Sequence, residues 1–387
     1  MKNYKILMFT GKGTAAPYII GDCKRALERL GCSITEFPIT RPMMDIRPVL
    51  RNIKPDFVFA LDHTGVDDQV FVEEKIMCFS WFVDNPLYFI NETHRSDFNI
   101  FAVTDKSYLP ELKRLGFQDV FYLPLATDIL RMRKSMRKKM RGAGSHDVYE
   151  TDISFVGTLG KRYTEWEEER NIKFPSPQKE LLDFLIKLKI SNPNVTFSEL
   201  FEYCDERFKN DIFKKLTALQ RGAIELRIDM ETSAYFREKY LKALKGYKVT
   251  VYGDEGWKDI LPENYSFGGK IDYEKDVGAL YRMAKVNLNV TRTQIQTGVN
   301  QRVLDIAATG SVFLTDYRTT TQEFFDCDIS DLMYKDEEEL KEKAGRLIKD
   351  DKKRKEIGEE LYQSVYNQHT YDQRMREMLE KIKNFEI

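Results

Sequence analysis

The chain has 387 residues, more than one hydrophobic core usually supports, so its length favours two domains of roughly 150 to 200 residues each. Its 61 basic and 62 acidic residues nearly cancel, which excludes a global field that would draw the chain to nucleic acid or to an anionic membrane. The five cysteines have no CxxC spacing, and no stretch of 18 apolar residues is present. We therefore expect a cytoplasmic protein without structural zinc, a disulfide framework or a transmembrane segment.

Apolar, strand-like runs alternate with amphipathic helices in the first half of the chain. "YKILMFT" at 4–10 predicts a buried strand, 19–31 predicts a helix that ends at Gly31, and "SITEF" at 33–37 predicts a second strand. Such alternation predicts a parallel, doubly wound sheet with binding loops at the carboxyl ends of its strands. Further strands are predicted at 56–62, 76–84, 99–105 and 119–125 and a helix at 107–116, and the polar residues at strand ends are Asp62, His63, Asp84, Asn85 and Asp105.

A basic segment interrupts this pattern. Seven Lys or Arg residues fall between Arg131 and Arg141, and Ile129, Met132, Met136 and Met140 have helical spacing. We predict a solvated linker helix that packs this apolar stripe, with a membrane-surface or acidic-partner contact as the less favoured alternative. No aromatic residues interleave with the charges, as a single-strand nucleic-acid groove would require, so no nucleic-acid partner is expected. The predicted domains are 1–145 and 146–369.

The second half repeats the plan of the first. Strands are predicted at 152–157, 247–253, 285–291 and 311–317, and a long helical stretch covers roughly 163–245. The last fifty residues read as helices that are broken near 367–375. The fold class predicted for the whole chain is therefore α/β, with two doubly wound parallel-sheet domains and a helical insertion at about 163–235 in the second.

The segment "TGVNQRVLDIAATGSVFLTDY" at 297–317 carries the strongest site signal. A turn at Gly298 leads into a helix that begins near Val299 or Asn300, whose free N–H groups would favour an anion. Arg302 in the first turn can bridge two phosphates, and Asp305 on the same face can accept hydrogen bonds from ribose hydroxyls. The alternative is an ordinary surface unit in which Arg302 and Asp305 form an ion pair.

Glycine turns after two other strands support the binding interpretation. "ISFVGTLGKR" places Gly157, Thr158 and Gly160 where backbone can approach a pyrophosphate. "VTVYGDEG" places Tyr252 and Gly253 at the end of the next strand, within reach of a base or sugar. Three such turns in one domain are more than turn chemistry requires.

These segments, in this order, resemble the CgeB-type glycosyltransferases, a family named for a spore maturation protein. The resemblance also includes "YEKDVGALYRMAKVNLNVTR" and "HTYDQRM" in the second half and "SWFVDNPLYFI" in the first. It covers nearly the whole chain except the basic linker and the helical stretch from about 163 to 235, and it is most specific at 273–317.

The resemblance implies a GT-B architecture, in which two Rossmann-like domains face each other across a cleft. The second domain would hold a nucleotide-sugar, with UDP expected from the architecture, and the first an acceptor such as flagellin or a surface glycan. The helix 370–387 would cross back to pack on the first domain. Asp305 stands where related enzymes usually carry glutamate, which shortens its reach to the ribose. The donor-side residues expected on these grounds are Gly157, Thr158, Lys161, Tyr252, Gly253, Tyr273, Asn289, Thr291, Arg292, Gly298, Val299, Asn300, Arg302 and Asp305.

Transfer needs a stabilised leaving diphosphate and, if configuration inverts, a base. Arg302, Lys161 and the helix terminus can serve the first need without a metal or cofactor. Asp84 in "VDNP" is the first candidate for the base and His63 in "LDHTG" the second, against the alternatives of a turn residue and a hydrogen-bonded loop histidine. On the acceptor side the candidates are Lys12, Gly13, His63 and Asn85.

Two other functions remain open from sequence. "GKGTAA" at 11–16, with Glu36 twenty residues beyond Ala16, has the outline of a dinucleotide fingerprint and would suit an NAD-dependent oxidoreductase. A GT-B-like chain can also keep its fold as a catalytically silent binding module.

Overall fold

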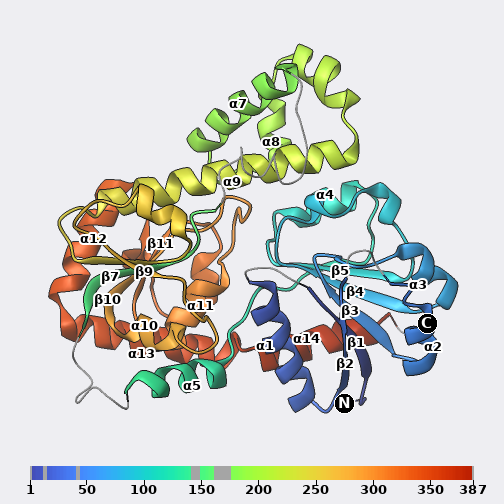
Figure 1. Cartoon of the computed structure of the whole chain (residues 1–387), viewed down its shortest axis with the longest axis horizontal. Coiled ribbons are helices and arrows are strands. Elements are labelled where there is room, and N and C mark those ends of the chain that lie inside the picture. Colours follow the sequence, from blue (N-terminus) through green and yellow to red (C-terminus); the bar gives the residue numbers. More distant parts are fainter. Residues whose placement is uncertain (1, 12–14, 41–43, 141–148, 161–175, 386–387) are drawn as a thin grey trace. The chain divides into compact units, whose positions relative to one another are not determined.

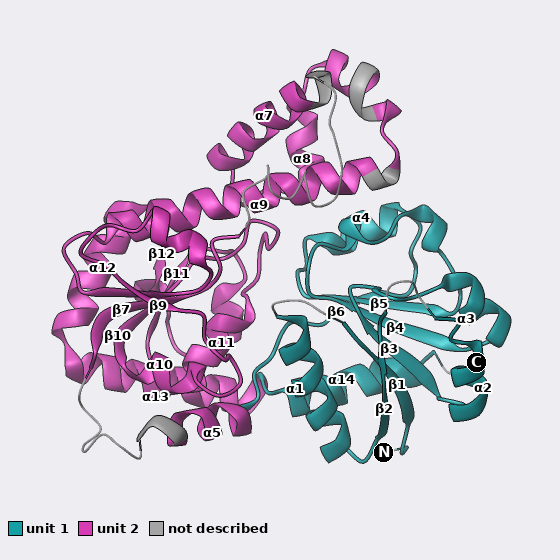
Figure 2. Ribbon diagram, in the orientation of Figure 1, with its two compact units in different colours: residues 1–128, 369–387 teal, residues 129–368 magenta. Residues whose placement is uncertain are grey.

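The computed structural model describes residues 2–11, 15–40, 44–140, 149–160 and 176–385. The chain divides into two compact units, the first formed by Met1–Asp128 with His369–Ile387 and the second by Ile129–Gln368 (Figure 2). Within the described ranges, every helix falls short of the combination of length and apolar character that a membrane span requires.

Unit 1 contains a six-stranded parallel sheet in the order β2-β1-β3-β4-β5-β6. Parallel register places Ile6 opposite Ile34 of β2 and Phe57 of β3. The strands are β1 Lys5–Thr10, β2 Ser33–Pro38, β3 Phe57–Leu61, β4 Met77–Phe82, β5 Asn99–Val103 and β6 Val120–Tyr122, and the helices are α1 Ala16–Arg29, α2 Arg47–Ile53, α3 Asp68–Glu74, α4 Tyr108–Arg114 and α14 Tyr371–Lys383.

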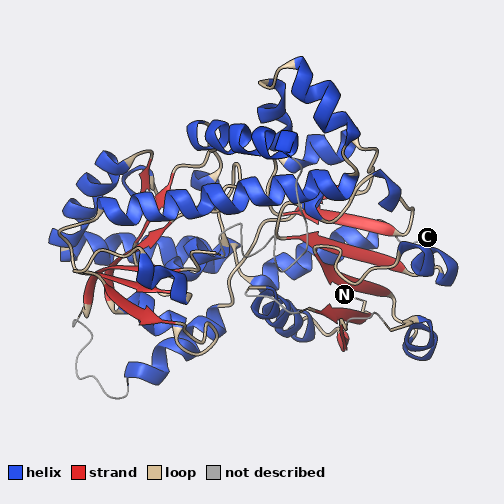
Figure 3. Ribbon diagram, turned by 45° about the horizontal axis from the view of Figure 1, so that its top comes forward, coloured by secondary structure: helices blue, strands red, loops and turns tan. Residues whose placement is uncertain are grey.

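The alternation of side chains along β1 explains how helices cover both faces of this sheet (Figure 3). Ile6 and Met8 point to one face and pack in a core shared with α1 and α14. Leu7 and Phe9 point to the other face, where the core includes residues of α2 and α3. Gly31, with a φ of 89°, takes the left-handed conformation that ends α1, as its position in the sequence predicts.

Unit 2 repeats this plan, with helices packed around a second sheet (Figure 1). The strand order of this sheet is β12-β11-β10-β7-β8-β9, and all pairs are parallel. The predicted doubly wound fold class is thereby confirmed for both units. Sequence reasoning missed the two edge strands, because β9 includes two glycines and β12 has only two residues. The strands are β7 Thr151–Val156, β8 Val249–Tyr252, β9 Ser266–Gly269, β10 Ala284–Asn289, β11 Phe313–Asp316 and β12 Met333–Tyr334.

The helices of unit 2 fall into two groups. One group covers the sheet, with α5 Ile129–Met140 packed on α10 Val277–Arg282, followed by α11 Gln301–Ala307, α12 Glu337–Lys349 and α13 Asp351–Gln368. The other group lies within the predicted helical stretch and consists of α7 Ser176–Ser191, α8 Phe197–Glu202 and α9 Ala218–Ala243. These three helices enclose a small apolar core of their own, which includes Leu181, Leu185 and Ile228. We call α7, α8 and α9 the helical excursion.

The boundary between the units lies earlier in the chain than the predicted position at 145. It falls between Asp128 and Ile129, so α5 belongs to unit 2. The reason is the apolar stripe of α5: Met132 is fully buried, and Ser135 accepts a hydrogen bond of 2.8 Å from the backbone N–H of Gly278 in α10. Arg131 is also buried, which corrects the expectation of a fully solvated cationic face. Arg141 lies outside the described residues.

The last helix, α14, belongs to unit 1 and contacts α1. A capping box between Thr370 and Gln373 fixes its start, and Met375, Met378 and Ile382 are fully buried. Burial of these side chains closes one face of the first sheet with residues from the far end of the sequence.

We expect Met378→Ala to lower the free energy of unfolding of unit 1 by about 2 to 5 kcal/mol, because the truncation leaves a cavity in a closely packed core. The matched control is Glu380→Ala on the exposed side of the same helix, with an expected change within about 0.5 kcal/mol. Urea unfolding followed by circular dichroism measures both variants. Equal stability of the two variants would contradict the packing of α14 described here.

Candidate functional site

The carboxyl ends of β7, β8, β10 and β11 meet at one edge of the second sheet because all strands of that sheet are parallel. The segments that follow these strands are 157–160, 253–254, 290–300 and 317–320. In open parallel sheets, ligands bind outside this edge. These four segments form the candidate site.

Asn289, the last residue of β10, links the segments to one another. Its amide oxygen accepts hydrogen bonds from Arg302 Nη1 at 2.7 Å and from Asn300 Nδ2 at 2.9 Å. Its amide nitrogen donates to Thr291 Oγ1 and Thr315 Oγ1, at 3.1 Å and 2.9 Å. Asn289 is fully buried, so it orients the residues that face a ligand instead of lining the site as predicted.

Arg302 contacts the glycine turn that follows β7, residues 157–160, which we call the first glycine turn. Its guanidinium group stacks over the Phe155 ring at 5.3 Å, and a Cβ added to Gly157 would come within 2.8 Å of its Nη2 atom. A larger residue at 157 would therefore force the Arg302 guanidinium group to shift. A Cβ at Gly253 would lie 2.2 Å from the carbonyl oxygen of Gly157, so the second glycine is required for the contact between the two turns.

The side chain of Asp254, which follows β8, binds the backbone of the first glycine turn. Its carboxylate accepts hydrogen bonds from the backbone N–H groups of Leu159 and Gly160, at 3.3 Å and 3.2 Å. The prediction that this turn offers its backbone to a pyrophosphate is therefore wrong for these two groups, because a side chain already binds them. Positive charge at this edge comes from arginine side chains instead.

Several arginines lie at this edge of the sheet, and two of them, Arg237 and Arg302, contact the turn 157–160. Arg237 of α9 is buried and donates to the carbonyl oxygen of Thr158. Burial lowers the pKa of Arg237 well below its ordinary value, and the neighbouring charges of Arg292 and Arg302 lower it further. Arg318 pairs with Asp316 at 2.9 Å. We call Arg237, Arg292, Arg302 and Arg318 the arginine cluster.

The helical excursion holds the segment 290–300 in place. Thr293 is fully buried and its hydroxyl lies 2.7 Å from that of Thr232 on α9; it also donates to Asp229 Oδ1 at 3.1 Å. Lys189 of α7 donates to Gln296 Oε1 at 3.0 Å. Burial lowers the pKa of the Lys189 ammonium group to about 8. Side chains from two helices therefore fix the loop that precedes α11.

Asp305 does not occupy the predicted position next to a ribose. Its side chain is fully buried, and Oδ2 accepts hydrogen bonds from Tyr273 OH at 2.7 Å and Arg131 Nη2 at 3.3 Å. The guanidinium group of Arg131 lies over the Tyr273 ring at 5.4 Å. Asp305 and Arg302 thus turn to different partners, so the alternative of an ion pair between them is also wrong. Asp305 anchors α5 on α11, and Tyr273 serves the same contact.

Most of the other predicted donor residues have structural contacts at this edge. Thr291 donates its backbone N–H to Asp316 at 2.7 Å, and Gly298 and Val299 are buried. The ring of Tyr252 packs on β9, where a Cβ at Gly268 would lie 2.2 Å from it. Asn300 keeps a buried side-chain oxygen without a hydrogen-bond partner among the described residues. Lys161 lies outside the described residues.

His63 in unit 1 is a structural residue, which corrects its prediction as a base or acceptor contact. Nδ1 lies 2.8 Å from Ser80 Oγ and Nε2 lies 3.2 Å from Asp68 Oδ1, so both ring nitrogens are engaged. Burial lowers the pKa of the imidazole. Asn85 is also buried and accepts a hydrogen bond from the backbone N–H of Leu87 at 3.0 Å, the role of a turn cap.

Asp84 is half-buried and follows β4, next to the buried carboxyl group of Asp62, which the sequence analysis also placed at a strand end. Asp62 accepts hydrogen bonds from the backbone N–H groups of Val83 and Asp84, at 2.8 Å and 3.0 Å. Burial, followed by the charge of Asp84, raises the pKa of Asp62 well above its ordinary value. Asp62 and His63 both have positive φ, 51° and 53°, a conformation uncommon outside glycine that is held here by these contacts.

Two predicted acceptor-side residues of unit 1 remain untested. Lys12 and Gly13, and with them the centre of "GKGTAA", lie outside the described residues. Glu36 sits within β2 and pairs with Lys24. Among the described residues, no group of three or more His, Cys, Asp or Glu side chains is arranged to hold a metal ion.

Sequence reasoning missed Arg237, Arg318, Asp316, Thr293 and Lys189. Arg237 stands in the middle of a 26-residue helix, where its spacing resembles that of any surface arginine. Asp316 and Arg318 had a signal, because Asp316 ends the strand β11 and Arg318 lies two residues beyond it. The other three become visible only when α7 and α9 pack on the strand ends.

The comparisons with known proteins concern this unit and the fold as a whole. Residues 234–380 match the model of a family described as glycosyl transferase-like. This range includes Asn289 and the arginine cluster, and leaves out the first glycine turn. No curated protein matches the sequence.

Solved structures resemble the chain over its entire length. They include the sucrose-phosphate synthase from Thermosynechococcus elongatus, with 10% identity, 99% of both chains covered and a TM-score of 0.58. A glycosyltransferase from Rickettsia africae has 10% identity over 100% of this chain and 99% of its own, with a TM-score of 0.56. BGT of T4 phage, in complex with its UDP-glucose substrate, has 11% identity over 98% of both chains and a TM-score of 0.52. The chain has the GT-B fold.

We expect Thr293→Val to destabilise unit 2 by about 1 to 3 kcal/mol, because the loss of the hydroxyl leaves buried polar groups of α9 with fewer partners. Hydrogen exchange of residues 290–300 should accelerate more than exchange in β10. Urea unfolding and exchange mass spectrometry measure the two effects. The control is Thr319→Val at an exposed position. Unchanged exchange in the loop would show that the excursion does not fix it.

Proposed function

We propose that the protein is a glycosyltransferase that moves a sugar from a UDP-linked donor to a hydroxyl acceptor. The observation that carries this proposal is the arginine cluster at the carboxyl edge of the second sheet. Arg237 is buried near the charges of Arg292 and Arg302, which disfavour its own charge, and of Asp254 and Asp316, which favour it, and Arg318 pairs with Asp316. A site that accumulates positive charge in this way suits a strongly anionic ligand.

A nucleoside diphosphate fits this charge and the chemistry of the leaving group. Negative charge develops on the diphosphate as the sugar departs, and fixed guanidinium groups stabilise it without reorganisation. Arg302 is held for this task by Asn289 on one side and by Phe155 on the other. The four arginines supply charge that a metal ion would otherwise provide, and we therefore propose transfer without a metal or cofactor.

Asn300 can contribute to donor recognition. Its buried side-chain oxygen has no partner among the described residues, whereas its nitrogen is bound to Asn289. Buried polar atoms in native proteins nearly always have a partner. We assign this oxygen to a hydroxyl group of the donor, in place of the ribose contact first expected of Asp305.

For the acceptor we propose that Asp84 removes the hydroxyl proton. Burial raises the pKa of the neighbouring Asp62 carboxyl, which favours its protonated form and avoids a second negative charge beside Asp84. Asp62 also binds the backbone N–H of Asp84 and so fixes the turn. A protein such as flagellin or a surface glycan, the acceptors implied by the CgeB-type resemblance, would supply the hydroxyl in the cytoplasm.

We expect Arg302→Ala to raise the dissociation constant of the UDP-sugar about 10- to 100-fold, because it removes charge-assisted hydrogen bonds to the diphosphate. Isothermal titration with UDP-glucose and related donors measures this, first in EDTA and then with magnesium or manganese. Arg346→Ala, an exposed position on α12, should bind like the parent chain. Equal donor affinity in Arg302→Ala would refute the site. Binding that vanishes in EDTA would refute the metal-free mechanism.

We expect Asp84→Asn to lower kcat by about 10²- to 10⁴-fold, the usual contribution of a general base, while donor affinity stays unchanged. The measurement is release of UDP from the donor in the presence of an acceptor lysate fraction, together with titration of the donor. Asp67→Asn, at the N-cap of α3, is the control for a carboxylate lost elsewhere in unit 1. Near-normal turnover in Asp84→Asn would exclude it as the base.

A further inference from the structure

A cavity in unit 2 lies away from the candidate donor site. It has a volume of about 410 Å³ and is lined by Arg133, Met136, Arg282, Ala308, Thr309, Gly310, Lys355, Glu359 and Tyr362. These residues come from α5, α10, α13 and the segment between α11 and β11. The donor site follows the carboxyl ends of the strands, whereas this cavity lies where the chain returns to the amino end of β11. The two are therefore at opposite ends of α11.

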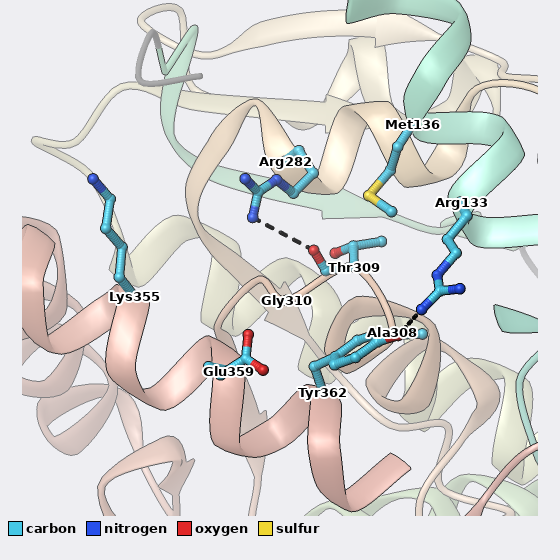
Figure 4. Close-up of a pocket in the computed structure, with 9 residues that line it drawn as sticks. All are labelled: Arg133, Met136, Arg282, Ala308, Thr309, Gly310, Lys355, Glu359 and Tyr362. Carbon is cyan, nitrogen blue, oxygen red and sulfur yellow. Dashed lines mark hydrogen bonds between the residues drawn. The ribbon is translucent and has the colours of Figure 1, made fainter. Parts of the chain in front are cut away.

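The cavity is strongly cationic. Figure 4 shows the basic side chains of Arg133, Arg282 and Lys355 on three sides of the segment Ala308–Gly310, with Glu359 as the one acidic side chain in the lining. Each basic group has a hydrogen-bond or ion-pair partner. Arg133 donates a hydrogen bond to Tyr362 OH, and Arg282 donates one to the carbonyl oxygen of Thr309 at 3.5 Å. Lys355 forms an ion pair with Asp351 at 3.1 Å. In Figure 4 the Arg282 guanidinium lies between the Lys355 ammonium and the Arg133 guanidinium.

The walls combine this charge with apolar and hydroxyl-binding surface. Met136 and the ring of Tyr362 offer apolar contact, and the Glu359 carboxylate can accept a hydrogen bond from a hydroxyl group. Gly310 lies beside Arg282 with a φ of 69°, a conformation that favours glycine, whereas an added Cβ would make only ordinary van der Waals contact with Arg282 Nη1, at 3.7 Å. The volume falls near the lower end of the range for small-molecule sites, about 300 to 1,000 Å³.

We propose that this cavity binds a phosphorylated sugar or polyol. Arg282, in the middle of the lining, would bind the phosphate dianion, with Lys355 and Arg133 adding positive charge on either side of it; Tyr362 and Met136 would contact the carbon skeleton, and Glu359 would accept from a hydroxyl. The ligand would contact the end of α11, and the first turn of this helix carries Arg302. It would also contact α5, whose Arg131 binds Asp305 of α11. The site is thus placed to affect donor binding through α11. The proposal rests on the cavity residues and does not depend on the proposed transferase activity.

The test is isothermal titration of the full chain, without donor, with glucose 6-phosphate as the probe and glucose and potassium chloride as uncharged and ionic controls. We expect saturable binding of glucose 6-phosphate alone. Lys355→Gln and Arg282→Gln should each weaken it about 5- to 10-fold, because each removes one unit charge near the phosphate. Glu359→Gln should tighten it about 3- to 5-fold, since a repelling charge is lost.

Lys352→Gln is the matched control, because it removes the same charge from an exposed position on the same helix outside the lining. Its affinity should equal that of the parent chain. Equal weakening by Lys352→Gln and Lys355→Gln would show unspecific attraction and overturn the proposal. So would absence of binding, or binding that Arg302→Ala abolishes and Lys355→Gln leaves intact, because the probe would then occupy the donor site. Circular dichroism confirms that each variant is folded.

Discussion

The candidate site depends on one buried amide, Asn289 at the carboxyl end of β10. Its oxygen accepts from Arg302 and Asn300, and its nitrogen donates to Thr291 and Thr315. Even its backbone carbonyl is bound, by Tyr334 OH at 2.8 Å. A buried amide whose donors and acceptors are all used has little freedom to rotate, and unsatisfied groups would be costly in this environment. The position of Arg302 is therefore fixed by the sheet itself.

The helical excursion gives this edge its remaining rigidity and part of its charge. Arg237 of α9 reaches the first glycine turn, and Thr232, Asp229 and Lys189 fix the loop before α11. Burying cations next to other cations is unfavourable, so the packing of α9 must stabilise an arrangement that electrostatics alone would disperse. Because folding already offsets this electrostatic repulsion, the site is prepared for a ligand that brings negative charge. The helical excursion thus stabilises the carboxyl edge of the second sheet.

Unit 1 uses the same materials differently. At the end of β3, two consecutive residues with positive φ, Asp62 and His63, are held by side-chain contacts to β4 and α3. Such conformations persist where the surroundings determine them strongly, and they are found at functional sites. Here Asp62 fixes the turn that carries Asp84. The histidine that seemed suited to proton transfer instead has both ring nitrogens in hydrogen bonds.

The sequence by itself determined most of the strands, several of the helices between them and the parallel, doubly wound class of both sheets, but not the order of the strands or the edge strands β9 and β12. The features that it determined can be read from neighbouring residues: strands and helices from the spacing of apolar residues, and helix ends from glycines such as Gly31 and Gly310. The placement of Arg302 near a strand end is local in the same sense. Only the tertiary structure decided which partner each polar side chain takes. Asp305 pairs with Arg131, 174 positions away, and Thr158 with Arg237, 79 positions away. Partner choice depends on which helix faces which loop, a consequence of packing that no local spacing records.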